Sequence, residues 1–379
     1  MFVIPPSASP ARRWLAHLLR AAAGSIRPGD RFDEERPLEP ADLRTLALRH
    51  RVAPLLHRGL VSGAIGDPLP ERLAEALRRD YYATLRKNVI ALELGAALLT
   101  DLSSAQVPAA PLEGWALLEG RHVVYPDAGL RPMDDLDLIV ARRDRERAGE
   151  VLRDHGFETV GTRTAARLSV GHEVTFHRRI AGVNLFVDLH WAWAGSETLM
   201  RGFAVSGEQF LEELCEPAAA GAILAPGWSP TRHGHLLFTA VHAARHAFSR
   251  WIWLVDLHRL VESGPQPWDL LLRQAAACRC RRLLYAGLAA ARELLRTPVP
   301  KEVLAELAPG PVRRQLLHRS LAAAGARESD LRPGRVAKLL LGESWWDVAR
   351  TAAPVRGWYA KRGEPTTLSR RLRSPVRGA

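Results

Sequence analysis

The stretch RPMDDLDLIV, residues 131–140, places three aspartates immediately before an apolar run that predicts a buried strand. Side chains alternate along a strand, so Asp135 and Asp137 are expected on one face, with the leucines on the other and Asp134 pointing away. Like-charged carboxylates repel each other and are costly near a core unless a cation lies between them. Carboxylate oxygens are the ligands that Mg²⁺ prefers, so this segment predicts a metal site.

A second strand-like run, NLFVDLHW at residues 184–191, carries Asp188 between two apolar residues. A third carboxylate from a neighbouring strand would complete a two-metal site of the kind that catalyses phosphoryl displacement. His190 shares the face of Asp188 and either lies beside the site or is a structural partner near the strand end. His172, in GHEVTF, opens another strand and is a weaker candidate.

Two positions upstream are candidates for binding phosphate. Gly114 lies at a turn into a helix, where backbone N–H groups are able to face an anion. Arg131 precedes Asp135 by four residues, and its planar guanidinium suits a triphosphate, although a surface role is the alternative.

Composition indicates a folded protein. The chain has 379 residues, of which 47% are apolar and 25% charged, enough for about two or three domains. The net charge of +12 raises the possibility of nucleic-acid binding, but residues 356–379 alone supply +6, from seven basic residues and one acid. The chain shows no recognisable nucleic-acid recognition module, so such binding is possible but not favoured.

Periodicity divides the chain into four parts. Apolar residues recur at helical spacing in an N-terminal region, 1–105, and again in a C-terminal region, 216–355. Between them, 106–215 contains period-two runs and one surface helix, which predicts a mixed α/β domain. The segment 356–379 is expected to be a basic, disordered tail. The predicted fold class is therefore α+β, with a mixed sheet flanked by helical regions.

The chain is expected in the cytoplasm. Its three cysteines, 215, 278 and 280, are too few for a disulfide framework and suit a reducing compartment. No apolar run is long enough to span a membrane, and the N-terminus is a poor signal peptide. His242 and His246, one helical turn apart, are expected to pack rather than bind zinc, because no Glu lies between them.

Several segments together resemble the bacterial nucleotidyltransferase-like proteins of the DNA polymerase β superfamily. They are LEGWALL, YPDAGLRPMDDLDLIV, FVDLHW and LLFTAVHAARHAFSRWIWLVDLHRL, with an N-terminal helical part at ALRHRVAPLLHRGL; the likeness spans roughly residues 40 to 265. The resemblance implies a polymerase-β-like mixed sheet, an NTP such as ATP as substrate and two Mg²⁺ ions as cofactors. It further implies that Asp135 and Asp137 hold the metals, that Asp188 completes the site and helps to activate the acceptor, and that the turn at Gly114 faces the phosphates.

The sequence departs from this family pattern at the turn. The superfamily usually has Gly-Ser or Gly-Gly where this chain has Gly114-Trp115, and related proteins often have Lys where this chain has Glu113. Glu113 therefore places an acid where a cation would meet the triphosphate, which affects how the nucleotide is oriented.

The predicted function is Mg²⁺-dependent transfer of a nucleoside monophosphate to a hydroxyl or phosphate acceptor. A small molecule or modified peptide is preferred as acceptor, in natural-product or surface-polysaccharide biosynthesis. One alternative is a toxin or regulator that nucleotidylates a protein or tRNA, which the basic tail would suit. Another is a non-catalytic nucleotide-binding scaffold, which Glu113 and the missing serine would suit.

Overall fold

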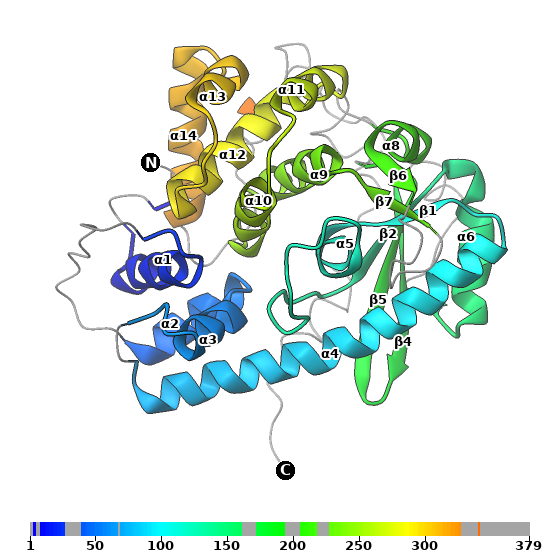
Figure 1. Ribbon diagram of the computed structural model, residues 1–379, viewed down its shortest axis with the longest axis horizontal. Coiled ribbons are helices and arrows are strands. Elements are labelled where there is room, and N and C mark those ends of the chain that lie inside the picture. The colour runs from blue at the N-terminus through cyan, green and yellow to red at the C-terminus, as the bar shows by residue number, and fades with distance from the viewer. Residues whose placement is uncertain are drawn as a thin grey trace, which may run out of the picture.

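A five-stranded mixed sheet lies on the right in Figure 1 of a computed structural model, with helices beside and above it. The structure describes residues 3–4, 8–26, 39–66, 69–160, 172–193, 205–217, 227–326 and 340–341. The predicted tail, 356–379, lies outside these residues. The strand order is β1-β2-β5-β4-β3, and only the β2–β5 pair is parallel.

The three strands predicted from period-two runs are present as β2 (Leu136–Val140), β4 (Glu173–Ile180) and β5 (Val183–His190). Two shorter strands, β1 (Ala109–Pro111) and β3 (Glu158–Thr159), were not predicted and form the two edges of the sheet. The chain leaves β2 through a short 3-10 turn and α6 (Arg145–Asp154), which returns it to the sheet. Between β4 and β5, Ala181 and Gly182 have φ of 49° and 77°, the positive values that a two-residue hairpin loop requires. This tight hairpin fixes the register that carries Asp188.

The N-terminal region is helical, as predicted. It contains α1 (Pro10–Ala22), α2 (Pro40–Arg49), α3 (Ala53–Val61) and α4 (Glu71–Ser104). Helices α1 to α3 each have a proline in the first turn, where its missing N–H costs nothing. Helix α4 is much the longest of these and runs from the α2–α3 pair to the sheet (Figure 1).

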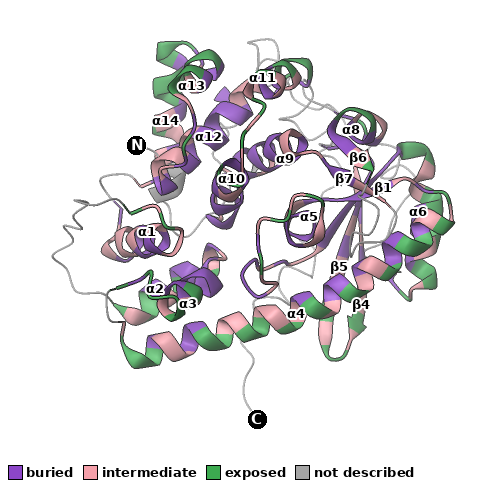
Figure 2. Ribbon diagram, viewed as in Figure 1, coloured by how far each residue is buried: buried purple, intermediate pink, exposed green. Residues whose placement is uncertain are grey.

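The C-terminal region is also helical. It contains α9 (Arg232–Arg245), α10 (Ile252–Glu262), α11 (Trp268–Ala277), α12 (Arg281–Leu295), α13 (Lys301–Leu307) and α14 (Pro311–Ala326), while α8 (Gly207–Leu214) precedes it in the 106–215 segment. A small ribbon of β6 (Cys215–Pro217) and β7 (Trp228–Pro230) precedes α9. Helices α9, α10 and α12 pack on one another, and α10 is buried along most of its length (Figure 2).

The two helical regions contact each other as well as the sheet. The imidazole of His50, after α2, stacks on Trp251 with ring centroids 4.4 Å apart. Arg20 of α1 donates from Nε to the carbonyl of Leu294 in α12 at 2.7 Å. The predicted α+β class, a mixed sheet flanked by N- and C-terminal helices, is confirmed. No helix in the described part of the chain is long and apolar enough to cross a membrane.

Candidate active site

Three aspartates from two parallel strands meet at the centre of the sheet. Asp137 of β2 is the register partner of Asp188 of β5, so the two carboxylates come from adjacent positions. Asp135 lies immediately before β2, two residues from Asp137, and acts electrostatically on both Asp137 and Asp188. Asp137 is only 7% exposed.

The negative charge of this cluster is not fully balanced by the positive groups around it. Burial, reinforced by the neighbouring carboxylates, raises the pKa of Asp135 to about 7 and that of Asp137 well above its usual range. Burial also raises the pKa of Asp188, although a hydrogen bond from Thr175 opposes the shift. Oδ1 of Asp188 is buried and has no hydrogen-bond partner within the described residues. Oxygen ligands that repel each other, with one orphaned atom, fit a hard divalent cation.

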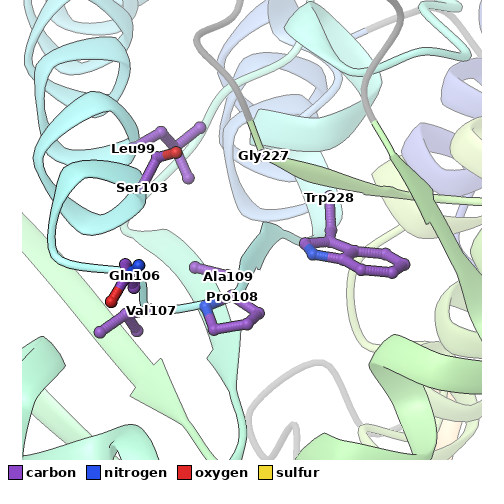
Figure 3. A pocket seen from close by; sticks show the side chains of 8 residues that line it. All are labelled: Leu99, Ser103, Gln106, Val107, Pro108, Ala109, Gly227 and Trp228. Atoms are coloured by element: carbon purple, nitrogen blue, oxygen red, sulfur yellow. The ribbon is translucent and has the colours of Figure 1, made fainter.

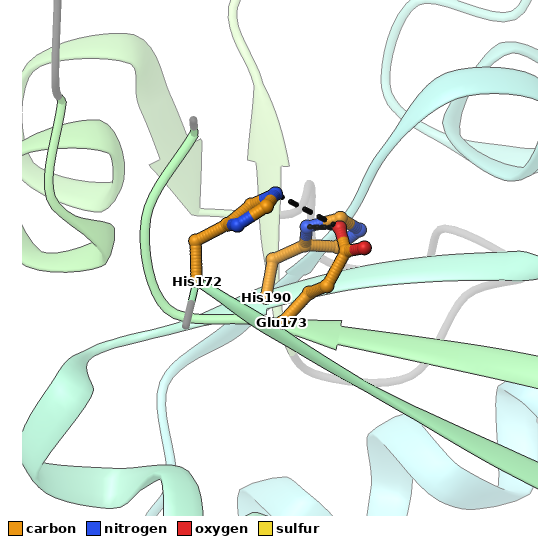
Figure 4. A group of neighbouring side chains, drawn as sticks. All are labelled: His172, Glu173 and His190. Carbon is orange, nitrogen blue, oxygen red and sulfur yellow. Dashed lines mark ion pairs between the residues drawn. The ribbon is translucent and has the colours of Figure 1, made fainter. Parts of the chain in front are cut away.

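His190 connects this cluster to a second group of side chains (Figure 4). Its Nε2 lies 2.9 Å from Oδ1 of Asp137, and its Nδ1 lies 3.4 Å from Oε2 of Glu173. The same oxygen of Glu173 is 3.1 Å from Nε2 of His172. Ligand atoms of Asp137, Asp188 and His190 lie within 4.8 Å of one another, as do those of His172, Glu173 and His190. His190 thus lies beside the aspartates, the first of its two predicted placements.

Sequence reasoning missed Glu173. It is the register partner of His190 across the β4–β5 hairpin, so its position follows from the strand pairing. Glu173 could have been found from the alternation in GHEVTF, which places Glu173 and Thr175 on one face of the strand and Val174 on the other. Because both strands form one hairpin, that face is the one that carries Asp188 and His190.

Glu113 is a fourth acid beside the aspartates. It lies at the start of α5 (Glu113–Glu119) with a positive φ of 50°, unusual for a residue other than glycine. Its Oε1 pairs with Nδ1 of His242 on α9. Burial disfavours its charge, but His242, assisted by Arg131, lowers the pKa of Glu113 to about 2. The ionised Glu113 in turn helps to raise the pKa of Asp135 and Asp137.

Arg131 has a protein partner in place of the triphosphate considered above. Its Nη2 lies 2.8 Å from Oδ2 of Asp256 on α10, and its Nε is 3.2 Å from both oxygens of that carboxylate. The hydroxyl of Tyr125 donates to Asp256 Oδ1 at 2.6 Å, and Nη1 of Arg131 donates to the carbonyl of Pro132. This buried network joins the loop before β2 to α10.

Gly114 is closely packed. A Cβ at this position would lie 2.8 Å from Nη1 of Arg131 and 2.8 Å from Cγ of Met133, so the glycine permits the approach of that loop. The next residue, Trp115, is 1% exposed and covers Gly95 of α4, where a Cβ would lie 2.6 Å from its ring. The unusual Gly114-Trp115 pair therefore fixes α5 between the loop and α4.

A separate pocket opens at the other end of β2 (Figure 3). Its volume is about 340 Å³, and its lining includes Ser103, Gln106 and Trp228. It also touches Ala109, which pairs with Val140, the last residue of β2, whereas Asp135 precedes the first residue of that strand. The pocket is thus distinct from the aspartate cluster.

Comparison with known families identifies the chain. Residues 36–296 match a family described as uncharacterised nucleotidyltransferase, which is more than half of the sequence. The chain belongs to this nucleotidyltransferase family. The match confirms the resemblance to nucleotidyltransferase-like proteins that the aspartate motifs indicated.

One solved structure is similar to this nucleotidyltransferase-family chain. It is the crystal structure of an antigenic nucleotidyltransferase-like protein from Paracoccidioides brasiliensis, with 15% sequence identity and a TM-score of 0.37. The match covers 56% of this chain and 95% of that one. No curated protein matches the nucleotidyltransferase sequence.

Proposed function

We propose that this protein is a Mg²⁺-dependent enzyme that transfers a nucleoside monophosphate from an NTP to a hydroxyl or phosphate acceptor. The observation that carries the proposal is the pairing of Asp137 with Asp188 beside Asp135, with Oδ1 of Asp188 left without a partner among the described residues. Asp135, Asp137 and Asp188 would hold the metal ions, two in number by analogy with other phosphoryl-transfer sites. Bound Mg²⁺ would neutralise charge that develops on the phosphate oxygens.

The reaction balances as an in-line displacement at the α-phosphorus. The acceptor oxygen forms a bond to that phosphorus, and the bond from phosphorus to the bridging oxygen of the β-phosphate breaks. Pyrophosphate leaves with that electron pair. Asp188 would take the proton from the acceptor, and its position opposite Asp137 on the neighbouring strand supports this role. His190 orients Asp137 through its 2.9 Å contact.

The acceptor we favour is a small molecule or modified peptide of a natural-product or polysaccharide pathway, in the cytoplasm. The buried thiols of Cys215, Cys278 and Cys280 suit a reducing compartment. A non-catalytic scaffold is less well supported, because a scaffold gains nothing from three aspartates whose pKa values are raised by burial and by neighbouring acids.

The test is transfer of label from each NTP, radiolabelled at the α-phosphate, in the presence of Mg²⁺ and a cell extract. Label is expected in a small molecule, and the same NTP labelled at the γ-phosphate should release its label as pyrophosphate. Transfer of the γ-label to the acceptor would show a kinase and contradict the proposal. Label in a protein or RNA would favour the toxin or regulator, and the Asp137→Asn variant gives the background.

A further inference from the structure

Three cations from three separate elements converge on Asp134, the neighbour of Asp135 in the chain. Arg51, in the turn between α2 and α3, pairs through Nη2 with Oδ2 of Asp134. Arg250, in the turn between α9 and α10, places Nη1 3.1 Å from the same oxygen. Lys87 of α4 donates from Nζ to the carbonyls of Met133 at 2.8 Å and Asp134 at 3.0 Å.

The positive charge at this point exceeds the negative charge of Asp134. Two guanidinium groups share one oxygen of this carboxylate and Lys87 binds the adjacent carbonyls, and Arg250 is close enough to Arg51 to disfavour its charge. Burial lowers the pKa of Lys87, and Asp135 is the other acid that acts on both Lys87 and Arg51. The cations therefore lie within electrostatic reach of the proposed metal site.

These side chains border a pocket that solvent reaches. Its volume is about 240 Å³, and its lining includes Arg51, Thr84, Lys87 and Asp134. The side chains of Arg51 and Asp134 are 36% and 33% exposed, so an anion from solution is able to approach them. Arg250 adjoins the pocket through its contact with Asp134.

The neighbouring alternatives for holding phosphate are already engaged. Arg131 is buried and paired with Asp256, and Gly114 is packed against Arg131 and Met133. Glu113 contributes negative charge on that side of the aspartates. The cations around Asp134 are thus the positive groups best placed for a polyanion beside Asp135.

We propose that Arg51, Lys87 and Arg250 bind the β- and γ-phosphates of the NTP, and that the carboxylate of Asp134 is a resident anion which those phosphates displace. This inference rests on the proposed function, since it names the phosphate site of the same reaction. Guanidinium groups bind phosphate oxygens through paired, charge-assisted hydrogen bonds, which a carboxylate imitates. The phosphates would join the α2–α3 turn, α4 and the α9–α10 turn at one point.

If phosphate displaces the carboxylate of Asp134, then removing that carboxylate should strengthen phosphate binding. Because Asp134 competes with the ligand for Arg51 and Arg250, replacing Asp134 with Asn should tighten binding of pyrophosphate, the product made of those two phosphates. Removing either arginine should weaken it. A site in which Asp134 merely orders the arginines would show the reverse for Asp134→Asn.

The experiment is calorimetric titration of the full chain with inorganic pyrophosphate in the presence of Mg²⁺. Arg51→Ala and Arg250→Ala should each weaken binding by about tenfold or more, and Asp134→Asn should tighten it by roughly threefold to tenfold. Arg78→Ala is the matched control, because it removes one positive charge from α4 at an exposed pair with Glu75. Its affinity should equal that of the parent. Lys87→Met provides an additional loss-of-charge variant if an arginine variant fails to fold.

Two results would overturn the inference: unchanged affinity in the arginine variants and Lys87→Met, or weaker binding by Asp134→Asn. The same proteins separate this inference from the proposed function. If the chain transfers the α-label but these variants bind pyrophosphate as tightly as the parent, the proposed enzyme activity stands and the proposed phosphate site is rejected. If the variants show the expected changes in pyrophosphate affinity but the chain transfers no nucleotide, the proposed phosphate site stands and the proposed enzyme activity is rejected.

Discussion

Two buried groups of charges lie close together in this protein and differ in how they are neutralised. In the first, Arg131 and Asp256 form a multiply hydrogen-bonded pair that Tyr125 completes. In the second, Asp135, Asp137 and Asp188 repel one another, and one oxygen of Asp188 has no partner in the described structure. The first group is complete without a ligand, whereas the second repels itself in a way that fits the proposed metal site. The difference separates a structural ion pair from a candidate active site.

The largest effect is expected when a carboxylate is removed from the second group, the aspartate cluster. Asp135→Asn and Asp137→Asn should each lower nucleotide transfer by about a thousandfold or more, because a hard anionic metal ligand is lost. The fold should survive, and the metal-free variants should be as stable as the parent or more stable, because repulsion falls. Turnover and thermal melting measure the two effects.

Asp134→Asn tests whether the loss is specific to the metal ligands, because it removes an adjacent carboxylate that pairs with Arg51 and Arg250 and is expected to act on phosphate affinity instead. Its turnover should change by less than about tenfold. Mg²⁺ and NTP should raise the melting temperature of the parent and of Asp134→Asn, but much less that of Asp137→Asn. Equal stabilisation of all the proteins would contradict the metal site.

The second test removes one partner of the first group, the ion pair between Arg131 and Asp256. Arg131→Met leaves Asp256 buried without its cation and should lower the free energy of unfolding by about 3–5 kcal/mol. The double variant Arg131→Met, Asp256→Leu removes both charges and should recover much of that loss. Urea unfolding of the single and double variants gives the coupling energy. Additive losses would mean that the pair does not act as a unit.

The pH dependence of stability sharpens the comparison. A raised carboxyl pKa means that the folded protein holds a proton which the unfolded chain has released, so stability falls as pH rises. For Asp135 the fall spans the interval from about 4, the unfolded value, to about 7. Metal-free protein should therefore lose stability from this site between about pH 4 and about pH 7, and Asp135→Asn should show a shallower fall. Urea unfolding in a chelator measures it; equal slopes would contradict the raised pKa.

The smallest expected effect concerns Glu173, which faces Nδ1 of His190. Glu173→Gln should weaken Mg²⁺ binding by about tenfold, because His190 would hold Asp137 less firmly. The control is Glu158→Gln on the exposed strand β3. Metal affinity can be read from Mg²⁺-dependent melting. A loss as large as that of Asp137→Asn would show that Glu173 is itself a ligand.

Much of the sheet was predictable because its signals are local. Alternation in DLDLIV and in NLFVDLHW identified β2 and β5, and the face shared by Asp135 and Asp137 follows from the same period. The parallel pairing that sets Asp137 opposite Asp188 is not local. It depends on the crossover through α6, and the sequence supplied only the matching apolar settings of the two aspartates.

The partners of the charged side chains were not predictable, since they are distant in sequence. Arg131 binds Asp256, 125 positions away, and Glu113 binds His242 on a different helix. Asp256 did carry a signal, because it interrupts the otherwise apolar run IWLVDL and a buried acid needs a cation. The sequence did not indicate that Arg131 would be that cation.

Helix α4 also determines how the molecule is able to deform. It has 34 residues, corresponding to about 51 Å, and contains no proline at which to kink. Arg44 of α2 is tied to it by a 2.8 Å pair with Asp80, and Gly95 seats it against Trp115. In mechanical terms α4 is an unkinked strut, so a displacement of α2 at its Asp80 end is expected to be transmitted along the helix to the Trp115 contact beside the sheet.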